Sequence, residues 1–199
     1  MTSNTEAGTV KVWELKAGSV NDFAPLVFAS ERDAASGMFD VSGAHLVWAK
    51  KPKVEVFVEP GKKSAKAMAD VSALTPGALA MNGKAKAALE SLLGKFGEFL
   101  ELDCEREARW FYNVTNLVEC IDEQNSVKKP SGAISKEAFF EAKVPRGIVV
   151  FKDPITAPAC LYVTEAGKAA IEDLVAAAGI TGLAIVEPGP GPKKPRPRA

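Results

Sequence analysis

One stretch of the sequence, RWFYNVTNLVECIDEQNS at residues 109–126, limits the possible fold more than any other. Its side chains alternate between two faces, with Trp110, Tyr112 and Val114 on one and Phe111, Asn113, Thr115 and Leu117 on the other. Because both faces are largely apolar, we expect a central strand that is covered on both sides. Core packing explains the three adjacent aromatic rings more simply than a ligand-binding platform does. The acids and amides after Val118 are typical of a turn.

The periodicity of apolar residues predicts two helices. Asn82 can cap the first, which glycines at 94 and 97 would end. Its apolar stripe consists of Ala85, Ala88, Leu89, Leu92, Leu93 and Phe96. Thr164 can cap the second, and Gly179 stands where a left-handed exit is expected. The stripe of this helix consists of Ala170, Ile171, Leu174, Val175 and Ala178.

Short runs rich in β-branched and aromatic residues predict the remaining strands, at residues 10–15, 54–58, 98–102, 148–151, 161–163 and 182–188. Residues 21–45 are rich in Gly, Ser, Asp and Ala and predict mostly loop. Together these elements predict an α+β fold, with a mixed, mainly antiparallel sheet, at least two packed helices and an irregular N-terminal lobe. We divide the chain into a lobe at 1–69, an α+β region at 70–188 and a Pro/Lys/Arg tail at 189–199 that we expect to be disordered.

Motifs and composition argue against most kinds of catalytic site. The single histidine, His45, lies beside an apolar run and is expected at a strand edge or in the core. No nucleophile elbow, phosphate loop, metalloprotease or dinucleotide motif occurs. The three cysteines form no CxxC pair, which argues against a disulfide framework or a zinc site. We therefore assign no catalytic, cofactor-binding or metal-binding residue, and we expect a protein that is not an enzyme.

The same composition bears on location and partners. No basic segment followed by an apolar run stands at the start, and no apolar run is long enough to span a bilayer. We therefore expect a cytoplasmic protein without a membrane partner. The lysines around residues 50–66 lack interleaved aromatic and arginine residues, so we expect no nucleic-acid partner either.

Acidic residues are concentrated between residues 98 and 123, where only two arginines oppose them. The acids are Glu98, Glu101, Asp103, Glu105, Glu107, Glu119, Asp122 and Glu123. The chain as a whole is neutral, so the four basic charges of the tail leave the rest of the chain net negative by four. This run is either a solvated face, which is the simpler interpretation, or a surface that attracts a basic partner. The eight acids are our candidate binding residues.

Three blocks between residues 70 and 188 share their order and spacing with a known pattern. An aromatic strand that leads into a D-x-E-x-S turn is matched by Tyr112, Asn113, Val114, Asp122 and Ser126. A short I-F-R strand is matched by Val150, Phe151 and Lys152. A V-S-E…K…I-E…G-x-T-G run is matched by Val163, Thr164, Glu165, Lys168, Ile171, Glu172, Gly179, Thr181 and Gly182. In this order the blocks resemble immunity family eleven of the bacterial polymorphic toxin systems, formerly a domain of unknown function with a myxobacterial reference member.

This resemblance implies a cytoplasmic protein that binds a cognate toxin and neutralises it without catalysis. It names neither the toxin nor the oligomeric state, and it transfers no binding residue, because the matched residues look structural. If the toxin is a basic nuclease, the acidic run would complement it. Two alternatives stay open. One is a scaffold or regulatory binding module unrelated to toxins, and the other is a histidine-independent hydrolase that would use a pair of carboxylates.

Overall fold

The computed structural model describes residues 10–32 and 38–189, and the tail from residue 190 onwards lies outside them. The fold is α+β, as the sequence predicts. The strands are β1 (Val12–Ala17), β2 (Leu26–Phe28), β3 (Lys53–Val56), β4 (Val71–Ser72), β5 (Leu79–Asn82), β6 (Gly97–Cys104), β7 (Arg109–Val114), β8 (Val127–Lys128), β9 (Ile134–Lys136), β10 (Val150–Phe151), β11 (Tyr162–Thr164) and β12 (Leu183–Val186). The helices are α2 (Gly83–Leu93) and α3 (Glu165–Ala178).

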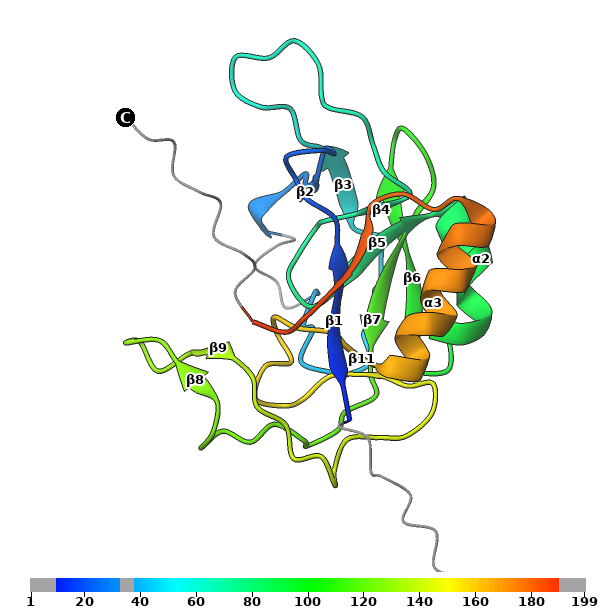
Figure 1. Cartoon of the computed structure of the whole chain (residues 1–199). Helices are drawn as coiled ribbons and strands as arrows, with labels where there is room; N and C mark the ends of the chain where they lie inside the picture. The colour runs from blue at the N-terminus through cyan, green and yellow to red at the C-terminus, as the bar shows by residue number, and fades with distance from the viewer. Residues whose placement is uncertain (1–9, 33–37, 190–199) are drawn as a thin grey trace, which may run out of the picture.

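The strands form two larger sheets where the sequence led us to expect a single mixed one (Figure 1). One has six strands in the order β2-β3-β6-β7-β5-β4, and its only parallel pair is β3 with β6. The other has four antiparallel strands in the order β10-β11-β1-β12. Among the described strands, β8 and β9 pair with each other alone, as a small hairpin at the lower end of the molecule. The mixed character expected from the sequence therefore belongs to the six-stranded sheet alone.

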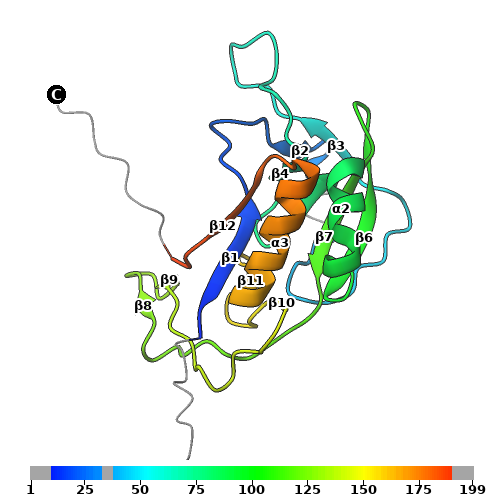
Figure 2. The ribbon, with the colours of Figure 1, turned by 45° about the vertical axis from the view of Figure 1, so that its right-hand side comes forward.

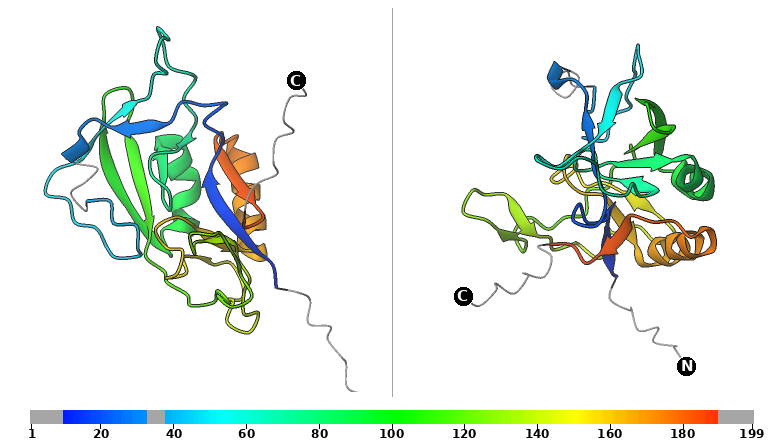
Figure 3. Two further views of the ribbon diagram at one scale, coloured as in Figure 1. Left: turned by 90° about the vertical axis from the view of Figure 1, so that its left-hand side faces the viewer. Right: turned by 90° about the horizontal axis from the view of Figure 1, so that it is seen from above.

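The main core lies where the two sheets meet the two helices. Helices α2 and α3 lie side by side on one side of the molecule (Figures 2 and 3). Their buried residues Leu89 and Ile171 meet Leu15 of β1 and Tyr112 of β7 in one apolar cluster. The outer face of each sheet is covered by irregular chain. Phe39 and Trp48 pack over Phe111 on the six-stranded sheet, and residues 118–149 cover the four-stranded one.

Strand β7 is central, as its pattern predicts, because it pairs with β5 on one side and β6 on the other. Tyr112 enters the main core and Phe111 the outer cluster, so both faces are covered. The strand ends at Val114, whereas the alternation predicted that it continues past Leu117. The amides of Thr115 and Asn116 turn away to the Phe96 carbonyl, and the chain crosses to the other sheet.

Both helices begin where their caps were expected. The side chain of Asn82 accepts a hydrogen bond from the Ala85 amide, and the hydroxyl of Thr164 accepts one from the Gly167 amide. Gly179 ends α3 in the left-handed conformation, with a φ of 58°. Helix α2 stops at Leu93, so Phe96 packs on the core from outside the helix.

The N-terminal residues contribute strands to both sheets. Strand β1 lies between β11 and β12, and strands β2 and β3 extend the six-stranded sheet. The boundary at residue 69 therefore marks a change in sequence pattern. Strands from before and after it lie together in both sheets. Between β1 and β4 the lobe is irregular, with only the two short strands β2 and β3 among its described residues.

Candidate partner-binding surface

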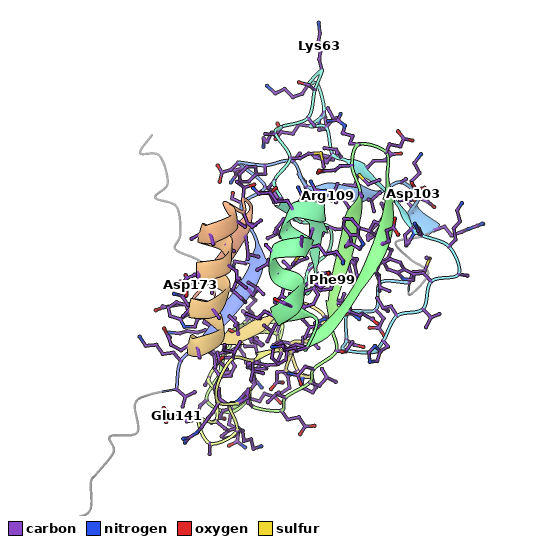
Figure 4. All side chains as sticks on the ribbon, turned by 90° about the vertical axis from the view of Figure 1, so that its right-hand side faces the viewer. Lys63, Phe99, Asp103, Arg109, Glu141 and Asp173 are labelled. Carbon is purple, nitrogen blue, oxygen red and sulfur yellow. The ribbon has the colours of Figure 1, made fainter. Side chains whose placement is uncertain are left out.

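The eight candidate acids do not form one surface. Five belong to the β6–β7 hairpin, whose connecting loop is at the upper end of the molecule, where Asp103 lies (Figure 4). The other three, Glu119, Asp122 and Glu123, lie on the segment between β7 and β8, which runs at the opposite end (Figure 1). The structure therefore divides the acidic run into two separate groups.

Neighbouring basic side chains already balance several of these acids. Glu101 pairs with Lys51 at 2.7 Å, Glu105 pairs with Lys53 at 2.6 Å, and Glu123 pairs with Lys128 at 2.7 Å. The hydrogen bond from Lys53 holds the pKa of the Glu105 carboxyl below its usual value. Lysines thus neutralise part of the charge, and Lys51 and Lys53 are about fifty residues away from their partners in sequence. The acidic field at the hairpin is weaker than the sequence suggested.

Three of the candidate acids hold the fold together. Glu107 pairs with Arg109, which is fully buried and also donates to the carbonyl of Ala69. Asp122 is 9% exposed, and its carboxylate accepts the amides of Gln124 and Asn125 in the turn.

The third, Glu98, receives hydrogen bonds from Asn113, His45 and the Leu46 amide. Burial alone would raise the pKa of Glu98, but these bonds outweigh it and lower the pKa. Through Glu98 the loop at 38–48 is fastened to β6 and β7. The role of Glu98 is therefore structural.

His45 is neither in the core nor at a strand edge, contrary to the expectation from its apolar neighbours. It lies in the irregular loop that covers the six-stranded sheet, and its side chain is 76% exposed. Its ring nitrogen Nδ1 lies 3.0 Å from a carboxylate oxygen of Glu98. The loop reaches the sheet through this contact instead of through a strand.

Residues of the third block, matched by the immunity-family pattern, also have structural roles. The backbone amide and hydroxyl of Thr181 donate to Asp70, which also accepts from Asn82 and so joins the end of α3 to the start of α2. A side chain at Gly182 would meet the Val71 carbonyl oxygen at 2.2 Å, so this position needs glycine. Thr181 and Gly182 therefore act within the fold.

A hollow of about 460 Å³ lies on the N-terminal lobe, and we call it the lobe hollow. It is lined by Val20, Asn21, Ala24, Pro25, Phe57, Glu59, Lys62, Ser64, Ala65 and Lys66. Two loops, at residues 18–25 and 57–66, form its walls. The second loop projects from the body of the protein, and Lys63 lies at its tip (Figure 4). The sequence pattern placed Phe57 and Val58 in the strand predicted at 54–58, but β3 ends at Val56, so both residues lie in the loop that follows it.

Large apolar side chains gather at the lobe hollow although they are exposed to solvent. Val20 is 51% exposed and Phe57 is 37% exposed, and Val58 next to it is also exposed. Exposed apolar side chains that cluster around a concave surface mark interaction sites in soluble proteins. The rim carries Lys62 and the ion pair of Glu59 with Lys66. This combination of apolar floor and charged rim resembles the organisation of a protein–protein interface.

A second hollow, the turn hollow, lies at the other end of the protein. Ile121, Asp122, Glu123, Gln124, Lys128, Phe140 and Ile155 line a space of about 540 Å³. Phe140 and Ile155 are both exposed there. It brings together two of the candidate acids, but Asp122 is used in the turn and Glu123 is paired with Lys128. The turn hollow is therefore the weaker candidate.

Burial affects two of the three thiols. Burial raises the pKa of the Cys120 thiol to about 12 and that of Cys160 to about 11, so both thiols stay protonated near neutral pH. No group of three or more His, Cys, Asp or Glu residues in the described ranges could hold a metal ion. None of the described helices has the length and apolar character needed to cross a membrane.

No model of a known protein family matches the chain, and no characterised protein matches it. The resemblance to immunity family eleven therefore stays a prediction that rests on the quoted residues alone.

Proposed function

We propose that this chain is an immunity protein that binds and neutralises a cognate protein toxin, and that the lobe hollow is the centre of the contact. The resemblance supplies the class of partner. The observation that supports the site is that the exposed apolar side chains of Val20 and Phe57 line a hollow on a projecting part of the protein. Removal of this apolar area from water would stabilise a complex, at about 25 cal/mol for each Å² buried.

The volume of the hollow, about 460 Å³, leaves room for large side chains of the partner. Interfaces concentrate their binding energy in a few large side chains that fill such pockets. The charged residues then fix orientation, because Lys62 and the Glu59–Lys66 pair line the hollow together with its apolar residues. As the resemblance implies, neutralisation proceeds by binding alone and takes place in the cytoplasm.

The hairpin acids would act beside this centre. Strand β3 runs parallel to β6, with Lys53 opposite Asp103, and the chain after β3 leads directly to Phe57. The end of the β6–β7 hairpin therefore lies on the same side of the molecule as the lobe hollow (Figure 1). Asp103 would attract a basic toxin, whereas the apolar residues of the hollow would hold it.

The test is co-expression with the protein encoded by the adjacent reading frame, followed by a growth assay, pull-down and measurement of the dissociation constant. Phe57→Asp and Val20→Asp should each weaken binding by at least about thirtyfold, the effect of a hot spot worth 2 kcal/mol or more. Two matched controls place the same carboxylate on other exposed apolar positions. Phe140→Asp in the turn hollow and Val47→Asp, which replaces a 93% exposed side chain, should leave binding unchanged.

The outcomes separate the proposal from its alternatives. Wild-type binding by both lobe variants would remove the lobe hollow from the interface. Failure of the wild-type chain to bind the neighbouring product, or to restore growth, would favour a scaffold or regulatory module. Each variant also needs a thermal melt, because loss of binding is informative only for a folded protein.

A further inference from the structure

The charged side chains that line the lobe hollow have a surplus of positive charge. They are Lys62, Lys66 and Glu59. Lys66 pairs with Glu59 at 2.5 Å, and its hydrogen bond and charge lower the pKa of the Glu59 carboxyl, with a smaller contribution from the charge of Lys62. Glu59 therefore stays ionised and balances one of the two lysines. Lys63, at the tip of the same loop, adds a further positive charge (Figure 4), whereas Asp22 in the other loop lies outside the lining.

Several hydrogen-bond donors line the same hollow. The Lys66 ammonium donates to the Val20 carbonyl at 3.1 Å and pairs with Glu59, so it joins the two walls. An ammonium has three protons, which leaves one for a group inside the hollow. Ser64 and Asn21 also line the hollow, and their hydroxyl and amide groups can donate. Such donors beside apolar side chains suit a carboxylate that is attached to a large apolar group.

An apolar stripe leads from the lobe hollow along the β2–β3 pair. Val27 lies opposite Glu55 in this pair, and alternation places both side chains on the face away from the buried Val54. The Phe57 amide donates to the Pro25 carbonyl at 3.0 Å, so the pairing continues past β3 and Phe57 lies on the same face as Val27. Val27 and Phe57 are each 37% exposed. The stripe thus extends the apolar surface of the hollow towards Glu55.

The other end of the stripe has a surplus of negative charge. Lys53 lies on the same face as Phe57, and the four residues between them span about 13 Å of extended chain. Lys53 pairs with Glu105 at 2.6 Å. The hydrogen bond with Glu105 raises the pKa of Lys53, and the charges of Glu105, Glu55 and Asp103 add to this effect. Three carboxylates therefore surround one lysine.

We propose, on the basis of the function proposed above, that the toxin binds this surface through a segment with opposite charges at its two ends. A carboxylate beside a large apolar side chain enters the lobe hollow, and a basic group lies against the acids around Lys53. The two ends of the stripe fix the direction of the segment, because the reverse orientation would bring like charges together. The contact therefore selects a segment with both charges over a uniformly basic surface.

The chemistry of the hollow can be tested without the toxin. The probes are 2-naphthoate, the neutral 2-naphthamide and the cationic 2-naphthylmethylamine, which share one aromatic group. In amide NMR spectra of the full chain, 2-naphthoate should bind with a dissociation constant of about 1 mM, as expected for a fragment of this size. The shifted signals should belong to residues 18–25 and 57–66. The amide should bind at least about fivefold more weakly, and the cation more weakly still. Equal binding of all three probes, or stronger binding of the cation, would overturn the proposal.

Two variants in the projecting loop decide whether the lining lysine is responsible. Lys62→Glu should weaken binding of 2-naphthoate by at least about fivefold. Lys63→Glu makes the same change of charge at the tip of the loop (Figure 4), outside the lining, and should alter the affinity by less than about twofold. Thermal melts verify that both variants are folded. Equal losses in the two variants would mean that the hollow provides only a general positive field, without a carboxylate site.

With the product of the adjacent reading frame as partner, two charge reversals report the direction of the bound segment. Lys62→Glu and Glu55→Lys should each weaken binding by at least about tenfold, because each places like charges together. A uniformly basic partner would bind Lys62→Glu more tightly than the wild type, and a uniformly acidic one would bind Glu55→Lys more tightly. Either result would contradict a segment with opposite charges at its ends.

The two experiments fail separately. If 2-naphthoate binds in the hollow but the adjacent gene product does not bind the chain, the proposed function and the partner named here are wrong, whereas the carboxylate site stands. If the gene product binds a chain that does not bind 2-naphthoate, the proposed function stands and the carboxylate site is wrong.

Discussion

The polar side chains of residues 70–188 and the apolar side chains of residues 18–69 are used in opposite ways. In the first region, the side chains of Asp70, Asp122 and Thr181 form hydrogen bonds with the protein's own backbone and with neighbouring side chains. In the second, Val20 and Phe57 remain exposed around the lobe hollow. In the region with the clearest sequence pattern, the polar side chains thus stabilise the fold itself. The irregular lobe is the region whose exposed apolar surface is available to a partner.

This contrast explains why a strong pattern can be a poor guide to a binding surface. Caps, tight turns and close approaches each require one residue type at one position, so they produce recognisable motifs. A binding surface needs only suitable area and chemistry, which many sequences provide. We therefore expect substitutions in the two regions to differ in kind, with losses of stability in one and losses of binding in the other.

The largest expected effect is loss of stability on truncation of the central strand. Tyr112 is fully buried between the two sheets, and its hydroxyl donates to the Leu93 carbonyl at 2.9 Å. Tyr112→Ala should lower the free energy of unfolding by about 3–5 kcal/mol, the usual cost of removing a buried ring. Phe57→Ala in the lobe should change it by less than about 1 kcal/mol. Urea denaturation measures both, and equal losses would remove the contrast between the regions.

Local signals in the sequence were sufficient for the two helices and for seven of the twelve described strands, whereas β2, β4, β5, β8 and β9 were not predicted. Asn82, Thr164 and Gly179 act as the helix ends that their residue types predict. Strand β5 was missed, because the residues that form it, LAMN, contain no β-branched or aromatic side chain. Its strand conformation comes from pairing with β7, a contact between distant parts of the chain. The division into two sheets depends on the same kind of long-range pairing and left no local signal.

The second expected effect is a dependence of stability on pH at the junction of the two regions. Lys152, on the chain after β10, is fully buried and donates to the carbonyl of Val41 in the lobe. Burial lowers the pKa of Lys152 to about 8, and the carboxylate of Asp40 offsets only part of this shift. In the unfolded chain the pKa is 10.5. Between these values the unfolded state binds more protons, so the free energy of unfolding should rise with pH.

The rise expected between pH 8 and pH 10 is about 1–3 kcal/mol, since one pKa unit corresponds to 1.36 kcal/mol. Chemical denaturation at several pH values measures it. Lys152→Met is the control, because it keeps an apolar stem of similar length and removes the titrating group. If the wild type and Lys152→Met show the same slope with pH, the lysine is not the source of the dependence.

The third expected effect is the loss of stability on truncation of Trp110, whose ring the alternation of the strand places on the same face as Tyr112. Trp110 is only partly buried and lies beside Gly83, with the ammonium of Lys86 5.6 Å from its ring centroid. Trp110→Ala should therefore cost about 1–2 kcal/mol, less than Tyr112→Ala. The pattern of the strand alone gives the two rings equal weight. Urea midpoints for the two variants would separate them, and an equal loss would mean that Trp110 is as well packed as Tyr112.

The candidate binding residues were the least predictable part of the sequence analysis, for a related reason. A run of acids is visible in the sequence, but the lysines that neutralise it come from elsewhere in the chain. Lys51 and Lys53 meet Glu101 and Glu105 only because β3 lies beside β6. The exposed side chains around the lobe hollow come from two loops that are more than thirty residues apart. Neither arrangement can be read from spacing.

The smallest expected effect tests what the acids contribute. The triple change Glu101→Lys, Glu105→Lys and Glu119→Lys breaks two exposed ion pairs, so it should lower the free energy of unfolding by less than about 1 kcal/mol. Exposed charges attract a partner over roughly 8 Å at physiological salt, so the change should slow association with the toxin and reduce its salt dependence. Because lysines already neutralise two of the three acids, we expect less than about a tenfold change in the association rate.

Stopped-flow measurements at low and high salt, with Phe57→Asp for comparison, separate the two contributions. Phe57→Asp should act mainly on the dissociation rate, since the apolar floor holds the partner only after contact. If the triple change instead weakens binding more than Phe57→Asp does, the acidic hairpin is the centre of the interface and the lobe hollow lies at its margin.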